Sequence, residues 1–345
     1  MGQAELAPWK LVCVPFAQEY PGNRQWNLGA PQLRVEPAPR QDYGGKSPHP
    51  YWDLLLEHLG KDLNNWIDPA KTGFYSGADY LRGWMASVIR HPFEPLPYLF
   101  FFGDQNTGKS SFHEAWDLLI TGGVVKAARA LTNKGDFNGE LLGAVVCVIE
   151  EVDLSKDKVT LDRIKDVVTC KQLSIRRMRM DSFMAPNTTH WVHCANSPDF
   201  VPVFDGDTRI TMIHVHRPSE DIPKMILQDR LKEEASFFLR TLLDFELPQV
   251  RGRLRIPVIE TDHKKRAMEH TRSMVELFFE HACESQEGAQ IEFAEFYQRF
   301  IAWLPFEQQT HWTKVKVSKK LPLSHSTIRG TNNIVFVSNA RWKDI

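Results

Sequence analysis

The chain has 345 residues, and its 42 lysine and arginine residues nearly balance its 43 aspartate and glutamate residues, which gives a formal net charge of −1. This balance excludes a protein that binds nucleic acid or membranes through its overall charge, so any nucleic-acid site must be a local patch. The five scattered cysteines contain no C-x-x-C pair, which argues against a disulfide framework or a zinc ribbon and favours a reducing cytosol.

Residues 1–50 are rich in proline, glycine and arginine, and because proline opposes helix we expect an extended segment there. Its Phe16, Tyr20 and Trp26 either dock on another subunit or cover the protein's own surface. The N-terminus has no apolar signal core, and no run reaches the ~20 apolar residues of a membrane helix, so we expect a soluble protein. The way the sequence starts is consistent with a piece of a longer protein.

Residues 51–95 are predicted to form a helical, collar-like lead-in. The stretches YWDLLLEHLG and SGADYLRGWMASVIRH carry apolar residues at helical spacing, and Ser76 is a candidate cap before the second. Three prolines after residue 91 end this region. Residues 96–102 are apolar at every position, which predicts a fully buried central strand of a parallel sheet.

Helix and buried-strand patterns alternate after residue 111, which predicts an α/β core over 96–220, with a parallel sheet between helices. A helical segment and a basic linker are expected over 221–269. Residues 270–345 predict a small α+β module with two helices and a C-terminal strand.

The pattern G-x-x-x-x-G-K-[ST] is complete at residues 103–110, between the predicted buried strand and a predicted helix. Its glycines let backbone N–H groups turn toward phosphate oxygens, Lys109 brings a charge to the β- and γ-phosphates, and the Ser110 hydroxyl can bind Mg²⁺. The positive end of the following helix faces the same anion. ATP and Mg²⁺ are therefore the predicted cofactors. The predicted nucleotide-binding residues are Gly103, Asp104, Gln105, Asn106, Thr107, Gly108, Lys109, Ser110 and Ser111.

Glu150 and Glu151 end an apolar strand about forty residues after Lys109. Two adjacent carboxylates at a buried strand end are costly unless a cation or hydrogen bonds offset their repulsion, and Mg²⁺–ATP supplies that cation. We assign Glu150 to the Mg²⁺ and Glu151 to polarising the attacking water. Adjacent strand residues point to opposite faces, so one of the two could be structural, and Asp153 is a reserve candidate.

Asn196 ends another predicted strand, where it can hydrogen-bond the γ-phosphate or the attacking water, although Asn-Ser-Pro is also an ordinary turn signal. Arg209 precedes the next strand. It could pair with Asp205 or Asp207, or it could reach the γ-phosphate of a neighbouring subunit as an arginine finger.

A basic stretch lies between the acidic strand end and Asn196, and its pieces at about 173–180 and 189–195 are predicted to pair as an antiparallel hairpin. Positive charge concentrated there suits contacts with a nucleic-acid backbone. The alternative is a solvated strand face with salt bridges. The predicted DNA-binding residues are Lys171, Arg176, Arg177 and Arg179.

His214 and His216 lie two apart on a predicted strand. We interpret them as part of a solvated strand face rather than as zinc ligands.

In this order, the phosphate loop, the Glu-Glu strand, the basic hairpin, the Asn-ended strand and the arginine resemble the superfamily 3 helicases, AAA+ motors of viruses, phages and plasmids. The helicase part of phage, plasmid and poxvirus-type primase-helicases is the most similar group, over roughly residues 51–245. The nucleotide-binding and acidic residues named above match the family's positions.

The resemblance makes Asn196 the sensor asparagine and Arg209 the arginine finger. Arg179 falls nearest the basic residue that enters the ring's pore, with Arg177 as second choice. Many relatives carry paired arginines where this chain has only Arg209, preceded by Thr208.

The resemblance implies a homo-oligomeric ring, hexameric in the family, that hydrolyses ATP between subunits and drags one strand of single-stranded or forked DNA through its channel in the 3′→5′ sense. It also implies replication of a mobile element in a bacterial cytoplasm, with a primase or polymerase as partner. The C-terminal module resembles a winged-helix-like tail. The alternatives are an ATP-dependent initiator or scaffold that does not unwind DNA, and a small-molecule kinase, which the basic hairpin and the Asn-ended strand disfavour.

Overall fold

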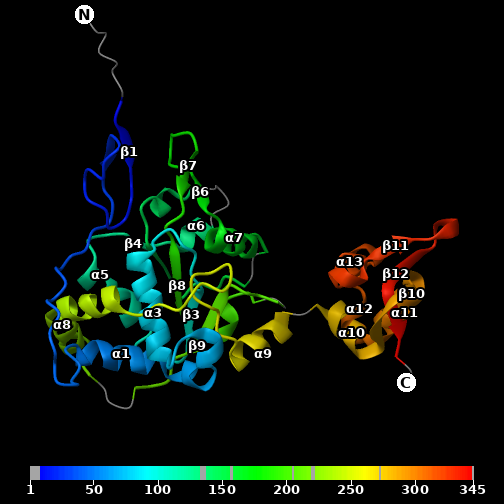
Figure 1. The fold of residues 1–345 in the computed structure, drawn as a ribbon. Coiled ribbons are helices and arrows are strands. Elements are labelled where there is room, and N and C mark those ends of the chain that lie inside the picture. The colour runs from blue at the N-terminus through cyan, green and yellow to red at the C-terminus, as the bar shows by residue number, and fades with distance from the viewer. Residues whose placement is uncertain are drawn as a thin grey trace, which may run out of the picture. The chain divides into compact units, whose positions relative to one another are not determined.

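The computed structural model describes residues 8–132, 137–155, 158–203, 206–218, 222–271 and 273–343. The chain divides into two compact units, Met1–Ala267 (unit 1) and Met268–Ile345 (unit 2). Unit 1 is built on a parallel sheet and unit 2 on an antiparallel one (Figure 1). Each unit has its own hydrophobic core.

The centre of unit 1 is a five-stranded parallel sheet with the strand order β4-β5-β8-β3-β9. At the carboxyl end of β3, Phe102 lies opposite Ala195 of β8 and His214 of β9. Every residue of β3 and β8 is buried, since helices or loops cover both faces of a parallel sheet. The five strands are β3 (Tyr98–Phe102), β4 (Val124–Lys126), β5 (Val146–Glu150), β8 (His190–Ala195) and β9 (Ile210–His214).

The predicted α/β architecture is therefore confirmed, and unit 1 has a fold of the P-loop NTPase type. The buried strand predicted at 96–102 is the one next to the edge strand β9. The short strand β4 was not anticipated, because its three residues are too few to give a pattern.

Helices that precede the first strand of this sheet in the chain, and one helix that follows its last strand, pack on the same face of the sheet. They share a hydrophobic core with β3, in which Trp52 stacks on Phe238 with ring centroids 4.1 Å apart. The side chain of Ser76 accepts a hydrogen bond from the backbone N–H of Asp79, which confirms the predicted cap. The helices that contribute to this core are α1 (Pro50–Gly60), η1 (Lys61–Asn65), α3 (Gly77–Arg90) and α8 (Lys224–Asp244). The short helix α2 (Pro69–Thr72) lies between η1 and α3 in the chain.

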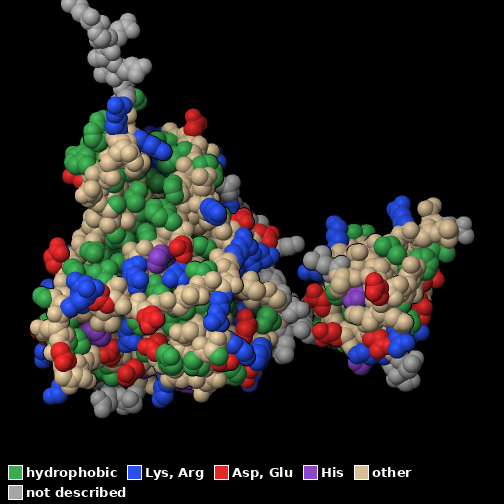
Figure 2. All heavy atoms as spheres, in the orientation of Figure 1, with side chains coloured by type: hydrophobic (Ala, Val, Ile, Leu, Met, Phe, Trp, Pro, Cys, Tyr) green, Lys and Arg blue, Asp and Glu red, His purple; other side chains and the backbone are tan. Residues whose placement is uncertain are grey.

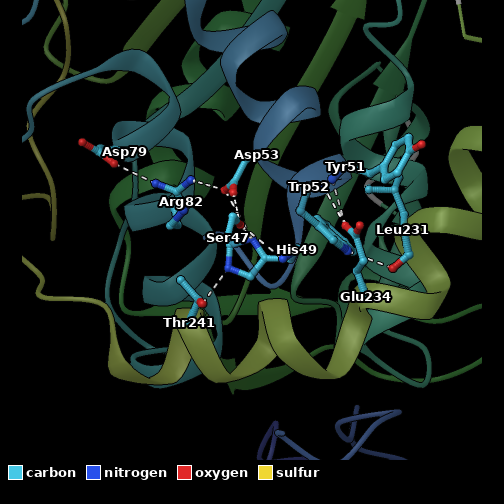
Figure 3. Close-up of polar contacts among 10 residues, drawn as sticks. All are labelled: Ser47, His49, Tyr51, Trp52, Asp53, Asp79, Arg82, Leu231, Glu234 and Thr241. Carbon is cyan, nitrogen blue, oxygen red and sulfur yellow. Dashed lines mark hydrogen bonds and ion pairs between the residues drawn. The ribbon is translucent and has the colours of Figure 1, made fainter. Parts of the chain in front are cut away.

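A polar network fastens the start of α1 to α3 and α8 (Figure 3). Asp53 accepts hydrogen bonds from Ser47 and, at 2.8 Å, from Arg82, and it lies 3.2 Å from the His49 ring. From α8, Glu234 accepts from backbone N–H groups in the first turn of α1. Burial alone would raise the pKa of Asp53, but hydrogen bonds from His49 and Ser47 and the nearby positive charges lower it to about 2.

The remaining helices up to residue 271 are short, except α7 and α9, and α9 continues past Ala267, the last residue of unit 1. The single helix predicted after the phosphate loop is two four-residue pieces on either side of Ala115. The elements are α4 (Ser111–Glu114), α5 (Trp116–Leu119), α6 (Ala128–Thr132), η2 (Gly139–Leu141), α7 (Lys158–Thr169), η3 (Pro198–Phe200) and α9 (Asp262–Thr271).

The basic stretch forms a hairpin, but with a different second strand from the one predicted. β6 (Gln172–Ile175) pairs with β7 (Phe183–Pro186), whereas the predicted partner at 189–195 contains the whole of β8, a strand of the central sheet. The prediction was wrong because a run that is buried on both faces belongs in the centre of a sheet, not in a hairpin.

The N-terminal segment is extended, as expected, with one short parallel pair of strands, β1 (Lys10–Val12) and β2 (Gln25–Asn27). Unit 2 holds a three-stranded antiparallel sheet with the order β10-β12-β11. Its elements are α10 (Met274–Ala282), β10 (Cys283–Glu292), α11 (Phe293–Trp303), α12 (Phe306–Gln309), α13 (Lys314–Ser318), η4 (Leu323–His325), β11 (Thr327–Arg329), η5 (Thr331–Asn333) and β12 (Val335–Trp342). In the described part of the chain, no helix combines the length and apolar character needed to cross a membrane.

Candidate functional site

A cavity of about 590 Å³ opens at the carboxyl end of β3. Loop residues 105–111 line one end of it, together with Glu151 and Asn196. Leu54 of α1 and Leu227 of α8 are among the apolar residues that line the cavity as well. A cavity of this size with polar groups at one place and apolar walls elsewhere is typical of a small-molecule site, at roughly 300–1,000 Å³.

The loop backbone adopts conformations that favour glycine. Gly103 has φ 148° and Gly108 has φ 84°, and Asn106 is also left-handed with φ 63°. A Cβ at Gly103 would lie 2.3 Å from the carbonyl oxygen of Val215, so only glycine fits beside β9. From α1, a ring nitrogen of His58 lies 2.8 Å from the carbonyl oxygen of Thr107, which ties the loop to the helical lead-in.

Lys109 is folded inward among neutral oxygens. Its Nζ donates to the carbonyl oxygens of Gly103 at 2.8 Å and Asp104 at 2.7 Å, and it lies 3.2 Å from Oδ1 of Asn196. Burial lowers the pKa of Lys109, against the opposing effect of the Glu151 charge. A buried ammonium group without a direct anionic partner is chemically suited to receive an anion such as a phosphate.

Asn196 links Lys109 to Glu151. Its Nδ2 donates to Oε2 of Glu151 at 2.8 Å, while its Oδ1 accepts from the lysine. Glu151 has a left-handed backbone with φ 52°, fixed by the hydrogen bond from its N–H to the carbonyl oxygen of Cys194. Strained backbone of this kind concentrates at functional sites. The ends of β3, β5 and β8 thus bring three predicted residues into one hydrogen-bonded chain.

Glu150 points to a different group of partners. Its carboxylate lies 3.2 Å from the His113 ring and 3.2 Å from Lys126 Nζ. Burial alone would raise the pKa of Glu150, but Lys126, His113 and a hydrogen bond with Ser110 bring it below the usual range. An ionised carboxylate in contact with the Ser110 hydroxyl offers the hard oxygen ligands that Mg²⁺ prefers, so these residues fit that ion.

The two adjacent glutamates therefore have separate surroundings, a question that the sequence left open. Glu151 lines the cavity and contacts Asn196, whereas Glu150 is held beside Ser110. The reserve candidate Asp153 accepts hydrogen bonds from the backbone and side chain of Ser155 and does not line the cavity.

Arg209 lies at the amino-terminal ends of the parallel strands, whereas the phosphate loop lies at their carboxyl-terminal ends. Its carbonyl oxygen accepts from the N–H of Tyr98, the first residue of β3, so it is about five strand residues, or roughly 16 Å, from the loop of its own chain. Its N–H donates to Asp207 at 2.9 Å, and Asp207 is in turn held by the buried Lys264. Among the described residues, the buried Nε of Arg209 has no hydrogen-bond partner. The other predicted partner, Asp205, is outside the described residues.

The tip of the β6–β7 hairpin keeps its positive charge uncompensated. No carboxylate in the described part of the chain forms an ion pair with Arg176, Arg177 or Arg179, so this exposed face does not have the salt bridges that the alternative included. The Arg176 guanidinium lies 5.1 Å from the centre of the Phe137 ring, and Arg179 has φ 60° in the turn. Lys171, the fourth predicted residue, is exposed just before β6.

Apolar side chains accompany these arginines. Figure 2 shows them, in green, over the part of unit 1 where Figure 1 places the N-terminal strands and the hairpin. On the hairpin, Met178 is 75% exposed, and Met180, Phe183 and Met184 are exposed as well. Charge next to exposed apolar surface is what a single strand of nucleic acid needs for its phosphates and its bases.

Four further residues contact the site without having been predicted. Arg217 pairs with Asp104 at 3.5 Å, and His58, His113 and Lys126 make the contacts given above. His113 follows Lys109 by one helical turn, which was a usable signal. The other three reach the site from separate segments, so only the folded structure brings them there.

Comparisons with known proteins agree with this fold. A family described only as a family of unknown function, DUF5906, matches residues 101–209. The apo structure of the NrS-1 C-terminal region (305–718) is similar with a TM-score of 0.63 and 15% identity, over 96% of this chain and 85% of that one. The A form of the same region gives a TM-score of 0.62 and 14% identity over the same shares.

A structure of JCV helicase bound to a small molecule has a TM-score of 0.36 and 12% identity, over 80% of this chain and 66% of that one, which is too low to carry an argument. No curated protein matches the sequence. The likeness to the NrS-1 region extends over almost the whole chain and establishes a shared fold.

Proposed function

We propose that this chain is an ATP-driven DNA helicase of the superfamily 3 type, which assembles into a hexameric ring and moves along single-stranded DNA. The observation that carries the proposal is the side chain of Asn196, which contacts both Lys109 and Glu151. A sensor residue that touches both the phosphate-binding lysine and the water-polarising carboxylate can link the state of the γ-phosphate to the shape of the sheet edge.

In this proposal each residue at the sheet edge has one task. Lys109 exchanges its carbonyl partners for the β- and γ-phosphates, and the loop N–H groups bind the same oxygens. Glu151 orients the attacking water and accepts its proton, and Asn196 positions Glu151. Ser110 and Glu150 would hold Mg²⁺, which supplies the charge that offsets the triphosphate.

The position of Arg209 supports hydrolysis between subunits. An arginine at the amino-terminal ends of the strands does not reach the phosphate loop of its own chain. It can instead contact a nucleotide bound to a neighbouring copy. Its backbone is anchored through Asp207 and Lys264, while the Nε of its guanidinium has no partner among the described residues, which leaves that group to bind an anion, as an arginine finger requires.

The hairpin supports DNA as the partner. Arg177 and Arg179 carry uncompensated charge for backbone phosphates, and the neighbouring methionines offer apolar surface to bases. In unit 2, one helix and one long strand are followed by three helices and then by two strands that complete an antiparallel sheet, and this mixture of helices with a small sheet supports a winged-helix-like module. We further propose a role in replicating a mobile element in a bacterial cytoplasm, beside a primase.

Strand displacement tests the proposal. Wild-type protein with ATP and Mg²⁺ should displace a labelled strand from a forked DNA duplex, and its ATPase rate should rise with single-stranded DNA. The variant Lys109→Ala should do neither, while Lys71→Ala, an exposed lysine away from the cavity, should behave as wild type. DNA-stimulated hydrolysis without displacement would favour the initiator or scaffold alternative over a helicase.

A further inference from the structure

Three side chains with metal-binding chemistry meet at the end of β9. Asp62 comes from η1, His214 ends β9, and His216 follows it. Each offers one ligand atom, and these atoms all lie within 4.8 Å of one another. The two imidazole rings have centroids 4.3 Å apart, because residues two apart on an extended chain face the same side.

The carboxylate of this cluster is poorly compensated. Asp62 is only 7% exposed, and its side chain accepts one long hydrogen bond, 3.3 Å, from the N–H of His214. No lysine or arginine in the described ranges forms an ion pair with it. A buried carboxylate without a cation is expensive, so a cation bound beside it would remove a cost that the fold otherwise carries.

We propose that Asp62, His214 and His216 bind a Zn²⁺ ion. Two imidazoles and one carboxylate are a donor set that suits this borderline-soft ion, and three protein ligands leave a fourth position for water. The graded burial of the three residues, from the buried Asp62 to the exposed His216, leaves an entry path from solvent.

This site is separate from the place where Mg²⁺ would bind, but it adjoins the phosphate loop. His214 lies opposite Phe102 in the sheet, and the next residue, Val215, presses its carbonyl oxygen against Gly103. The ion would join η1 to the end of β9. It would thereby stabilise the segment after β9 against which Gly103 of the phosphate loop packs. It would do so whatever reaction the loop supports.

The sequence gives only half of this site. The histidine pair alone is an ordinary strand face, and the third ligand lies 152 residues away from His214 along the chain. Folding brings Asp62 to the pair, because η1 packs against β9. The zinc proposal differs from the interpretation of the histidine pair as a solvated strand face, and the titration below decides between them.

Metal titration of the full chain tests this inference. Protein stripped with a chelator is titrated with Zn²⁺ against a chromophoric competitor, in excess Mg²⁺ so that sites for hard cations are filled. Wild type should bind one ion per chain, with a rise in melting temperature. His216→Gln removes a ligand, so it should weaken binding by at least the roughly 10–100-fold that loss of an outer-shell partner costs. His91→Gln, which alters an imidazole beside the single carboxylate of Glu94, should leave binding unchanged.

His216 is exposed, so its substitution does not threaten folding, and equal melting temperatures of variant and wild type in chelator would verify this. Asp62→Asn should also abolish the Zn²⁺-dependent rise in melting temperature. Substoichiometric binding by wild type, or equal Zn²⁺ affinity in wild type and His216→Gln, would overturn the proposal. Neither readout depends on ATP hydrolysis, so the outcome is independent of the helicase proposal.

Discussion

Asn196 and Glu151 end up 2.8 Å apart, Nδ2 to Oε2, although 45 residues separate them in the chain. Their strands, β8 and β5, are neighbours in the sheet, and both end at the edge where the phosphate loop begins. This hydrogen bond therefore joins the ends of β8 and β5, beside the loop that follows β3.

Glu151→Gln should separate binding from hydrolysis. The amide keeps the shape of the side chain but does not accept a proton, so the hydrolysis rate should fall by about 10²–10⁴. Nucleotide affinity should stay within a few-fold of wild type, because Lys109 and the loop are unchanged. Single-turnover hydrolysis and equilibrium binding of a fluorescent ATP analogue measure the two effects. Asp199→Asn, an exposed carboxylate in η3 shortly after β8, is the control, and an equal loss there would contradict the assignment.

Arg179→Ala should weaken DNA binding and spare basal ATPase activity. Removal of one phosphate contact lowers the slope of log affinity against log salt by about 1. Fluorescence anisotropy with a single-stranded oligonucleotide at several salt concentrations measures this. Arg230→Ala, an exposed arginine of α8, is the matched control. Unchanged single-strand affinity together with unchanged unwinding would remove the hairpin from the mechanism.

Arg209→Ala should inactivate the neighbouring subunit rather than its own. Mixtures with Lys109→Ala should then recover part of the ATPase activity, because some subunit interfaces in a mixed assembly combine an intact lysine with an intact arginine. Each variant alone should be nearly inactive. Mass spectrometry verifies that the assemblies are mixed. No recovery in verified mixtures would count against action between subunits.

Asp53→Asn should destabilise unit 1 in a pH-dependent way. The folded-state pKa of Asp53 is lowered to about 2, so its stabilising contribution is full above the unfolded value near 4 and disappears as the pH falls toward 2. We expect a cost of about 1–2 kcal/mol at pH 6, after allowance for partial exposure, and a smaller cost at pH 3. Melting temperatures of wild type and variant at both pH values provide the measurement. A difference that does not depend on pH would contradict the assignment.

The sequence was sufficient to predict the structure wherever one short segment determines its own conformation. The apolar run at 96–102 could only be a buried strand, and the glycines around Lys109 required a loop with unusual backbone angles. Ser76 was recognisable as a cap because its bond partner is three residues away. These are local properties of the chain, and the structure confirms the fold that they predict.

The sequence was insufficient where distant segments meet. The hairpin partner of β6 was misassigned, because two nearby stretches have strand character and only the sheet's need for a fully buried strand decides between them. Likewise, nothing local shows that Lys126 would reach Glu150 or that Asp62 would reach His214. Such contacts depend on strand order, which is a property of the whole domain.

At position 151, stability and catalytic activity favour different residues. A side chain in left-handed backbone costs on the order of 1 kcal/mol, which glycine would avoid. A library of variants ranked by thermal endurance should therefore enrich glycine or asparagine at this position, while the same library ranked by turnover should retain glutamate. The difference between the two rankings at this one position would measure how much thermal stability the protein loses to keep its catalytic activity.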